Sequence, residues 1–339
     1  MACSTPGRDV TDRRLDPSPP PDTTPDGGAP GGALSQEALG PSAGGIEPAG
    51  ALLGVPVAPR RPRRVPWTRP RLLLPSVIVL LMVVMAIAPQ LFAGWFGHGD
   101  PLACQLKLSS QGPRSGHPFG FDVQGCDVYA NVVHGARASI TIGLLTTAAT
   151  LLVAVVLGTL AGYHGGWVDL LISRVMDILF GFPALVGMIV ILSVWNRHDV
   201  FGISAMLTLF TWPPLTRVMR ASVIETRGLD YIEAARGVGV STPRLLVRHI
   251  GLNAIGPVVV LAGLNIGAII TAEAALTFLG VGLQSPTISW GVQLNTAQQY
   301  YASSPHLLIF PSIFLSVTVL AFVMLGDGLR DALDPKLTR

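Results

Sequence analysis

Long apolar segments alternate with short polar ones from residue 72 to residue 326. Apolar runs of spanning length cover residues 72–92, 136–162, 167–195, 200–219, 253–282 and 305–326. A helix of about 20 apolar residues crosses the hydrocarbon core of a bilayer, so the pattern predicts an all-α polytopic membrane protein with six transmembrane helices. Trp212, Pro213 and Pro214 interrupt the fourth run, which a membrane helix tolerates when neighbouring groups satisfy the freed carbonyls.

The character of the chain is different before the first run. Residues 1–65 are rich in Pro, Gly, Ser and Asp and predict a disordered tail, because they offer too little apolar area to offset the entropy of ordering them. Residues 66–339 form the predicted membrane domain. The first apolar run begins only at Leu72, too far from Met1 for a secretory signal peptide. Whether the tail is an unselected extension or docks a specific partner stays open.

The overall composition supports a membrane protein. Half of the residues are hydrophobic, 13% are charged and the mean hydropathy is +0.53, whereas soluble domains carry about 25% charged residues. The net charge is only +3, and no folded basic surface is predicted around the basic residues. A nucleic-acid-binding function is therefore excluded.

The positive charges predict the orientation. Arginines flanking a span keep that flank in the cytoplasm, and binding of anionic headgroups by the same residues is a secondary possibility. Six spans return the C-terminus to the side of the N-terminus, so residues 221–252 face the cytoplasm and residues 93–135 form an outer loop. The basic residues on the predicted inner side include Arg60, Arg61, Arg63, Arg64, Arg69, Arg71, Arg217, Arg220, Arg227, Arg236, Arg244, Arg248, Arg330, Lys336 and Arg339.

The cysteines agree with this orientation. Cys104 and Cys126 both lie in the predicted outer loop, where a pair can oxidise, while Cys3 lies in the tail. We predict a disulfide between Cys104 and Cys126; two unrelated thiols are the alternative. No Cys/His spacing indicates a metal site.

Residues 221–252 are polar, although apolar runs flank them. Asp230 and Glu233 have the spacing of a capping box, which predicts a short helix that ends at Gly237 and Gly239. A second helix is expected from Thr242 to Gly251, with Pro243 in its first turn. Helices this short are marginal in water, so a packing partner is expected. The alternative is an amphipathic interfacial loop in which Glu233 serves only its own helix.

Several residues within the predicted spans are candidates for function or packing. Glu273 is a candidate for the transport pathway or a gate, with an interhelical polar contact as the alternative. Asp177 is expected to pair with Arg174 on the same helix face. Gly158 and Gly162 fit close helix packing of the small-xxx-small kind.

Glu233-Ala234-Ala235, followed by three further residues and then Gly239, resembles the EAA loop of type I ATP-binding-cassette importer permeases. From about residue 72 to the end the chain is similar to the second permease subunit of the dipeptide/oligopeptide family. It departs from the family where His249-Ile250-Gly251-Leu252-Asn253 replaces HILPN and where Gly125-Cys126-Asp127 replaces GRD. The motifs that carry the resemblance are HPFGFDVQG, GARASITIGL, LAGYHGGWVD, AEAALTFLGVG and LGDGLRDALDP.

The resemblance implies the type I importer permease fold and a translocation subunit in a bacterial plasma membrane. In such permeases the EAA loop is a coupling helix seated in a groove of a cytoplasmic ATPase. By this resemblance Glu233, Ala234, Ala235 and Gly239 form the core of the ATPase contact, and Arg236 and Arg244 are weaker candidates at its edge.

The implied partners are a second homologous permease in a heterodimer, two ATPases or one fused ATPase, and an extracytoplasmic substrate-binding protein. The chain contains no P-loop, so ATP and Mg²⁺ belong to the partner ATPases and no cofactor is expected in this chain.

Two other classes of function are weighed against this one. An intramembrane enzyme is disfavoured because neither HExxH nor GxSxG occurs. A secondary transporter without ATPases stays the alternative, although it leaves the polar helix pair unexplained. Peptides are the favoured substrate by resemblance, with nickel chelates also open.

Overall fold

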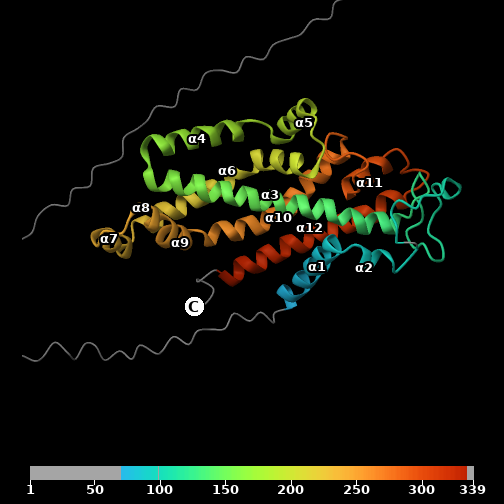
Figure 1. Ribbon diagram of the computed structural model, residues 1–339, viewed down its shortest axis with the longest axis horizontal. Helices are drawn as coiled ribbons and strands as arrows, with labels where there is room; N and C mark the ends of the chain where they lie inside the picture. Colours follow the sequence, from blue (N-terminus) through green and yellow to red (C-terminus); the bar gives the residue numbers. More distant parts are fainter. Residues whose placement is uncertain (1–69, 98, 334–339) are drawn as a thin grey trace, which may run out of the picture. The chain divides into compact units, whose positions relative to one another are not determined.

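The computed structural model describes residues 70–97 and 99–333. The predicted tail, Cys3, the arginines before residue 70, Lys336 and Arg339 lie outside the described residues. The described part is helical and contains no β-strand, in agreement with the predicted all-α class (Figure 1). Its helices are α1 (Pro70–Ile87), α2 (Gln90–Ala93), α3 (Val128–His164), α4 (Gly166–Gly181), α5 (Ala184–Trp195), α6 (Val200–Arg227), α7 (Asp230–Gly237), α8 (Thr242–Arg244), α9 (Leu252–Ala254), α10 (Gly256–Phe278), α11 (Trp290–Ala297) and α12 (His306–Leu333).

Three described helices are long and apolar enough to cross a membrane alone, namely α3, α10 and α12. The pair α4 and α5 makes a fourth crossing if it counts as one span, and α1 is a shorter apolar helix. α6 fills the fourth predicted position and continues through Pro213 and Pro214 to Arg227, eight residues beyond the predicted end. The six apolar runs are thus mainly helical and in the predicted order, although the first run, 72–92, is divided between α1 and α2 at Ala88 and Pro89.

The third predicted span, 167–195, is not one straight helix. It breaks between Gly181 and Ala184, and the two halves meet at 92°. Phe182 is extended (φ −97°, ψ 133°) because the ring of Pro183 disfavours a helical conformation in the preceding residue. The sequence prediction of an uninterrupted span was therefore wrong at this proline.

α3 and α6 pack at very short distance through two glycines of α3. A Cβ atom on Gly158 would lie 2.6 Å from Cβ of Met219, and one on Gly162 would lie 2.8 Å from the carbonyl oxygen of Arg220. No residue larger than glycine fits at these positions without moving α6. The predicted close packing at Gly158 and Gly162 is confirmed.

Ion pairs connect α4 to α6. Arg220 donates two hydrogen bonds to the Asp169 carboxylate, at 2.5 and 2.6 Å, which is the bidentate geometry that fixes a guanidinium. Asp177 pairs with Arg217 of α6 at 2.8 Å, so the predicted pair with Arg174 is wrong. The sequence spacing favoured a partner on the same helix, but α6 runs beside α4 and supplies one across the interface.

The segment before α3, residues 94–127, forms what we call the distal loop, at the end of the helical bundle opposite α7–α9 (Figure 1). Cys104 and Cys126 form a disulfide within it. Gly125 has φ +77°, and a Cβ there would collide with the Gln105 carbonyl, so glycine is required where this turn closes. The disulfide and this turn thereby hold the segment around Cys104 next to the segment around Cys126.

Asp127 joins the distal loop to the bundle. Its Oδ1 caps α3 by accepting the Tyr129 N–H at 2.8 Å, and its Oδ2 lies 2.7 Å from Nδ1 of His117. The N-cap explains why α3 begins eight residues before the predicted position 136. His306, at the start of α12, lies 3.2 Å from the Phe121 carbonyl and adds a second contact between loop and bundle.

Candidate functional site

The candidate site is the EAA segment, residues 228–255, which connects α6 to α10 at one end of the bundle (Figure 1). It contains α7, α8, a π-helical stretch η3 (Leu245–Gly251) and α9. The predicted pair of short helices is therefore present, but the cap of the first helix and the end of the second differ from the prediction.

The predicted capping box at Asp230 and Glu233 does not form. The N-cap of α7 is Leu229, with no hydrogen bond from a side chain, because the turn after α6 leaves Leu229 as the last extended residue. Asp230 is the first helical residue, and both carboxylates lie in the first turn, where negative charge favours the helix dipole.

The second helix also departs from its predicted limits. It begins at Thr242 after an N-cap at Ser241, with Pro243 in its first turn, but it does not end at Gly251. Gly251 is right-handed (φ −59°, ψ −46°) and the chain continues into α9. Glycine permits a helix stop without enforcing one, and here the buried Ile250 and Ala254 favour continuation.

The turn between the helices is a glycine C-cap. α7 ends at Gly237, and Gly239 adopts φ +81°, a conformation that costs other L-residues about 1–2 kcal/mol. Val238 and Val240 donate their N–H groups to the carbonyls of Ala234 and Ala235, which closes the end of α7. Gly239 therefore has the turn-forming position that the sequence indicated.

Buried side chains attach the segment to the bundle. Ile232, Leu245 and Ile250 are no more than 1% exposed and share one cluster with Met219 and Val223 of α6, and with side chains of α3 and α10. The helices are thus not free-standing: one face is packed within this chain and the other is open.

The open face carries the residues expected to contact a partner. Glu233, Ala234, Arg236, Gly239 and Arg244 are exposed, whereas Ala235 is half-buried against the cluster. Next to them Val238 is 81% exposed and Val247 is 73% exposed. Exposed apolar side chains beside small and charged residues are typical of a surface that a protein partner covers.

Two arginines, one at the end of α6 and one in α7, contact the last turn of α3, and sequence reasoning missed the link. Arg227 at the end of α6 donates to the carbonyls of Gly162 and Tyr163, at 2.9 and 3.0 Å. The guanidinium of Arg236 lies 5.6 Å from the centre of the Tyr163 ring, a cation–π distance. The sequence contains only a weak signal for these contacts, namely that arginines favour the C-terminal end of a helix such as the one that ends before Gly165. The arginines lie more than 60 residues from their partners, so local spacing does not reveal the contacts.

Glu273 of α10 is fully buried. Its Oε1 accepts a hydrogen bond from Thr277 on the same helix at 2.9 Å, and Oε2 has no hydrogen-bond partner in the described part of the chain. Full burial within this chain fits an interior polar contact better than an open channel wall. Its role in the transport pathway stays a prediction.

These features define a polytopic helical membrane protein with a partly buried, partly exposed helix pair at one end. The chain belongs to the family described as the binding-protein-dependent transport system inner membrane component, whose model matches residues 154–339.

Curated relatives extend the similarity toward the N-terminus. The chain is 38% identical to the glutathione transport system permease protein GsiD of Pectobacterium atrosepticum, over 67% of this chain and 75% of that protein. It is 36% identical to the dipeptide transport system permease protein DppC of Alkalihalophilus pseudofirmus, over 77% and 84% of the two chains. It is 34% identical to the oligopeptide transport system permease protein OppC of Bacillus subtilis, over 78% and 86%.

Proposed function

We propose that this chain is the translocation subunit of an ATP-driven importer of short peptides and that its EAA segment is the site of coupling to an ATPase. The observation that carries the proposal is the two-sided packing of this segment. Ile232, Leu245 and Ile250 fix one face to the bundle, while Glu233 and Val238 stay exposed on the other. A rigidly attached element with an open face can transmit the movement of a partner to the helices.

Within this proposal each side chain of the open face has a distinct role. Ala234 and Ala235 allow close approach of the ATPase groove, and Gly239 forms the turn. Glu233 offers a charge to basic or backbone donors of that groove. Arg236 and Arg244 lie at the edge of the contact.

The path of force runs through packed side chains. Closure of the ATPases would displace α7, and the buried cluster would carry the displacement to α6 and α10. The contacts of Arg227 and Arg236 at the end of α3 add a second path, since both meet at Tyr163. Alternating access follows from movement of these helices as packed units.

The proposed assembly has a second homologous permease, two ATPases or one fused ATPase, and an extracytoplasmic substrate-binding protein. In this assembly the EAA segment and both termini face the cytoplasm, and the distal loop with its disulfide faces outward. The distribution of arginines and the position of the cysteine pair support this orientation. ATP and Mg²⁺ bind to the ATPases, and this chain performs no hydrolysis.

Short peptides are the proposed substrate because relatives are named for dipeptides, oligopeptides and glutathione. Secondary transport without ATPases has no support from the family and would leave the exposed face of the EAA segment without a role.

The test is affinity purification of the tagged chain from its own cells, followed by an ATPase assay on what co-purifies. We expect a second permease and one or two ATPases, and reduced or uncoupled hydrolysis after Glu233→Ala. Gly239→Ala should weaken the assembly, because Gly239 has a positive φ that alanine adopts only at a cost. Gly237→Ala is the matched control, because Gly237 has no positive φ. At both positions an added Cβ would meet no atom within 4 Å, so the two variants differ in backbone strain and not in space. A lone chain that moves solute without ATP would refute the proposal.

A further inference from the structure

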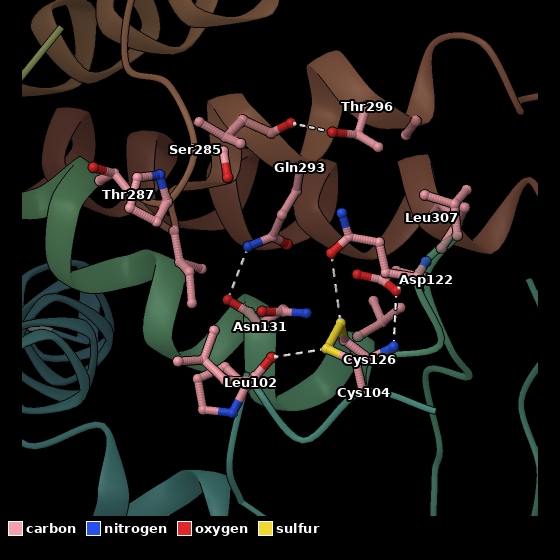
Figure 2. A pocket seen from close by; sticks show the side chains of 18 residues that line it. Leu102, Cys104, Asp122, Cys126, Asn131, Ser285, Thr287, Gln293, Thr296 and Leu307 are labelled. Atoms are coloured by element: carbon pink, nitrogen blue, oxygen red, sulfur yellow. Dashed lines mark hydrogen bonds between the residues drawn. A yellow bond between two sulfur atoms is a disulfide. The ribbon is translucent and has the colours of Figure 1, made fainter. Parts of the chain in front are cut away.

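A pocket of about 230 Å³ lies at the distal end of the bundle, far from the EAA segment (Figures 1 and 2). Four parts of the chain form it: the distal loop, the start of α3, the stretch from Ser285 into α11, and Leu307 at the start of α12. The Cys104–Cys126 disulfide is part of its wall. Nothing in the coupling mechanism uses this cavity.

The charge in the pocket comes from one residue. Among the described residues that line it, Asp122 is the one ionisable side chain, since Cys104 and Cys126 are joined in the disulfide. Oδ1 of Asp122 already accepts the N–H groups of Gln124 and Cys126, both at 2.8 Å. These backbone N–H groups fix the carboxylate, which is the one negative charge on the described wall of the pocket. The pocket therefore favours a cation.

Burial raises the pKa of the Asp122 carboxyl above its ordinary value, although hydrogen bonds from backbone N–H groups oppose the shift. A carboxylate that is partly desolvated gains more from a bound cation than one in open water.

Neutral polar groups lie beside this acid. Figure 2 shows the side chain of Asn131 within the ring of residues around the cavity, next to the disulfide. Gln293 is held to the wall, because its Nε2 donates to the Asn131 carbonyl at 2.8 Å. Asn131 and Asp122 both line the cavity, so the carboxamide of Asn131 can donate to a carbonyl oxygen of a ligand whose cation Asp122 accepts.

The remaining wall is apolar, with Leu102, Val123, Val128, Ile288 and Leu307 among the lining residues. The volume is below the roughly 300–1,000 Å³ of pockets for drug-sized ligands, so it suits a single amino-acid residue. The first residue of a peptide presents an ammonium group, a carbonyl carbon two bonds from the ammonium nitrogen and, in some residues, a small apolar side chain.

We propose that this pocket binds the N-terminal residue of a short peptide, with Asp122 accepting from the terminal ammonium and Asn131 contacting the first carbonyl. The inference deepens the proposed function and rests on it only for the choice of peptides as ligands. It places a substrate contact on this chain itself, at the face where a peptide would enter.

The test measures binding to the purified full chain in lipid nanodiscs, without ATPases or ATP. The probes are alanyl-alanine and N-acetyl-alanyl-alanine, in which acetylation replaces the charged ammonium by a larger neutral amide. We expect alanyl-alanine to bind ten- to a hundredfold more tightly, the range for loss of a charge-assisted hydrogen bond. Its binding should weaken as the pH falls through the pKa of Asp122.

Two variants complete the test. Asp122→Asn keeps the Oδ1 acceptor for the turn and removes the charge, so it should abolish the difference between the two probes. Thr296→Trp, at an exposed position of α11 that lines the pocket, should fill the cavity and abolish binding of both. Equal binding of the probes to the wild type, no binding of either, or an unchanged preference in Asp122→Asn would overturn the inference. Because no ATPase is present, these outcomes are independent of whether the chain couples to one.

Discussion

Replacing Ile232 by alanine should release α7 from the bundle while the membrane helices stay folded. The Ile232 side chain is fully buried in the cluster shared with α6 and α10. The substitution removes three carbon atoms, which at about 0.8 kcal/mol each gives about 2.4 kcal/mol before any cavity term. Measured costs of such truncations are about 2–5 kcal/mol. The opening equilibrium of α7 should therefore rise at least about fiftyfold.

Amide hydrogen exchange of the chain in nanodiscs measures this opening directly. The N–H groups of Val238 and Val240, which bond to carbonyls within α7, should exchange faster in Ile232→Ala, and those in the middle of α10 should not. Val238→Ala is the control, because that side chain is 81% exposed and its loss uncovers little. Unchanged exchange in Ile232→Ala, or equal acceleration by both variants, would refute the view that Ile232 anchors the segment.

Three further predictions concern other parts of the chain. Gly158→Ala should destabilise the protein by about 1–3 kcal/mol in thermal unfolding, because α6 must move away to make room for the methyl group. The control is Gly263→Ala on α10, which should be neutral or slightly stabilising, because an added Cβ there would meet no atom within 4 Å. Exchanging Cys104 and Cys126 for serine should cost about 3 kcal/mol for a separation of 22 residues, and reductant should lower the unfolding temperature of the wild type but not of the double variant. Burial raises the pKa of Asp122 in the folded state, so on raising the pH the unfolded chain releases this proton first. The free energy of unfolding should therefore fall as the pH rises from the ordinary Asp pKa to the raised one, and Asp122→Asn should remove this pH dependence.

The sequence predicted the order of the helices because each apolar run is long and lipid imposes helical structure on it. Their ends were less predictable, since they depend on single residues. Asp127 extends α3 by capping it, and Pro183 breaks α5 from α4. Both signals are present in the sequence, but hydropathy outweighed them.

Contacts between helices could not be predicted from local spacing. Asp177 was expected to pair within its helix and instead meets Arg217 from α6. The contacts of Arg227 with the end of α3 were missed for the same reason, because such pairs exist only once the helices are packed. The glycines of α3 were predictable, because small residues at a spacing of four are themselves the condition for close approach.

Within the candidate site the turn was predictable and the capping was not. Gly239 has the positive φ that its position after α7 indicated, whereas Leu229 replaces the expected acidic cap. The anchoring role of Ile232 requires knowing which face of α7 meets the bundle. The side chains that fix the segment were therefore found only in the structure, while Glu233, Ala234, Arg236 and Arg244 of its open face were named from the sequence.

The central claim is that this chain moves peptide only when ATP is hydrolysed by a partner attached to the EAA segment. The most direct measurement is uptake of a labelled dipeptide into proteoliposomes that contain the purified assembly and its binding protein, with ATP enclosed on the ATPase side. The account predicts uptake that requires both ATP and the binding protein and that is reduced in Gly239→Ala but retained in Gly237→Ala. Uptake that proceeds without ATP, or that is equal in the two glycine variants, would contradict it.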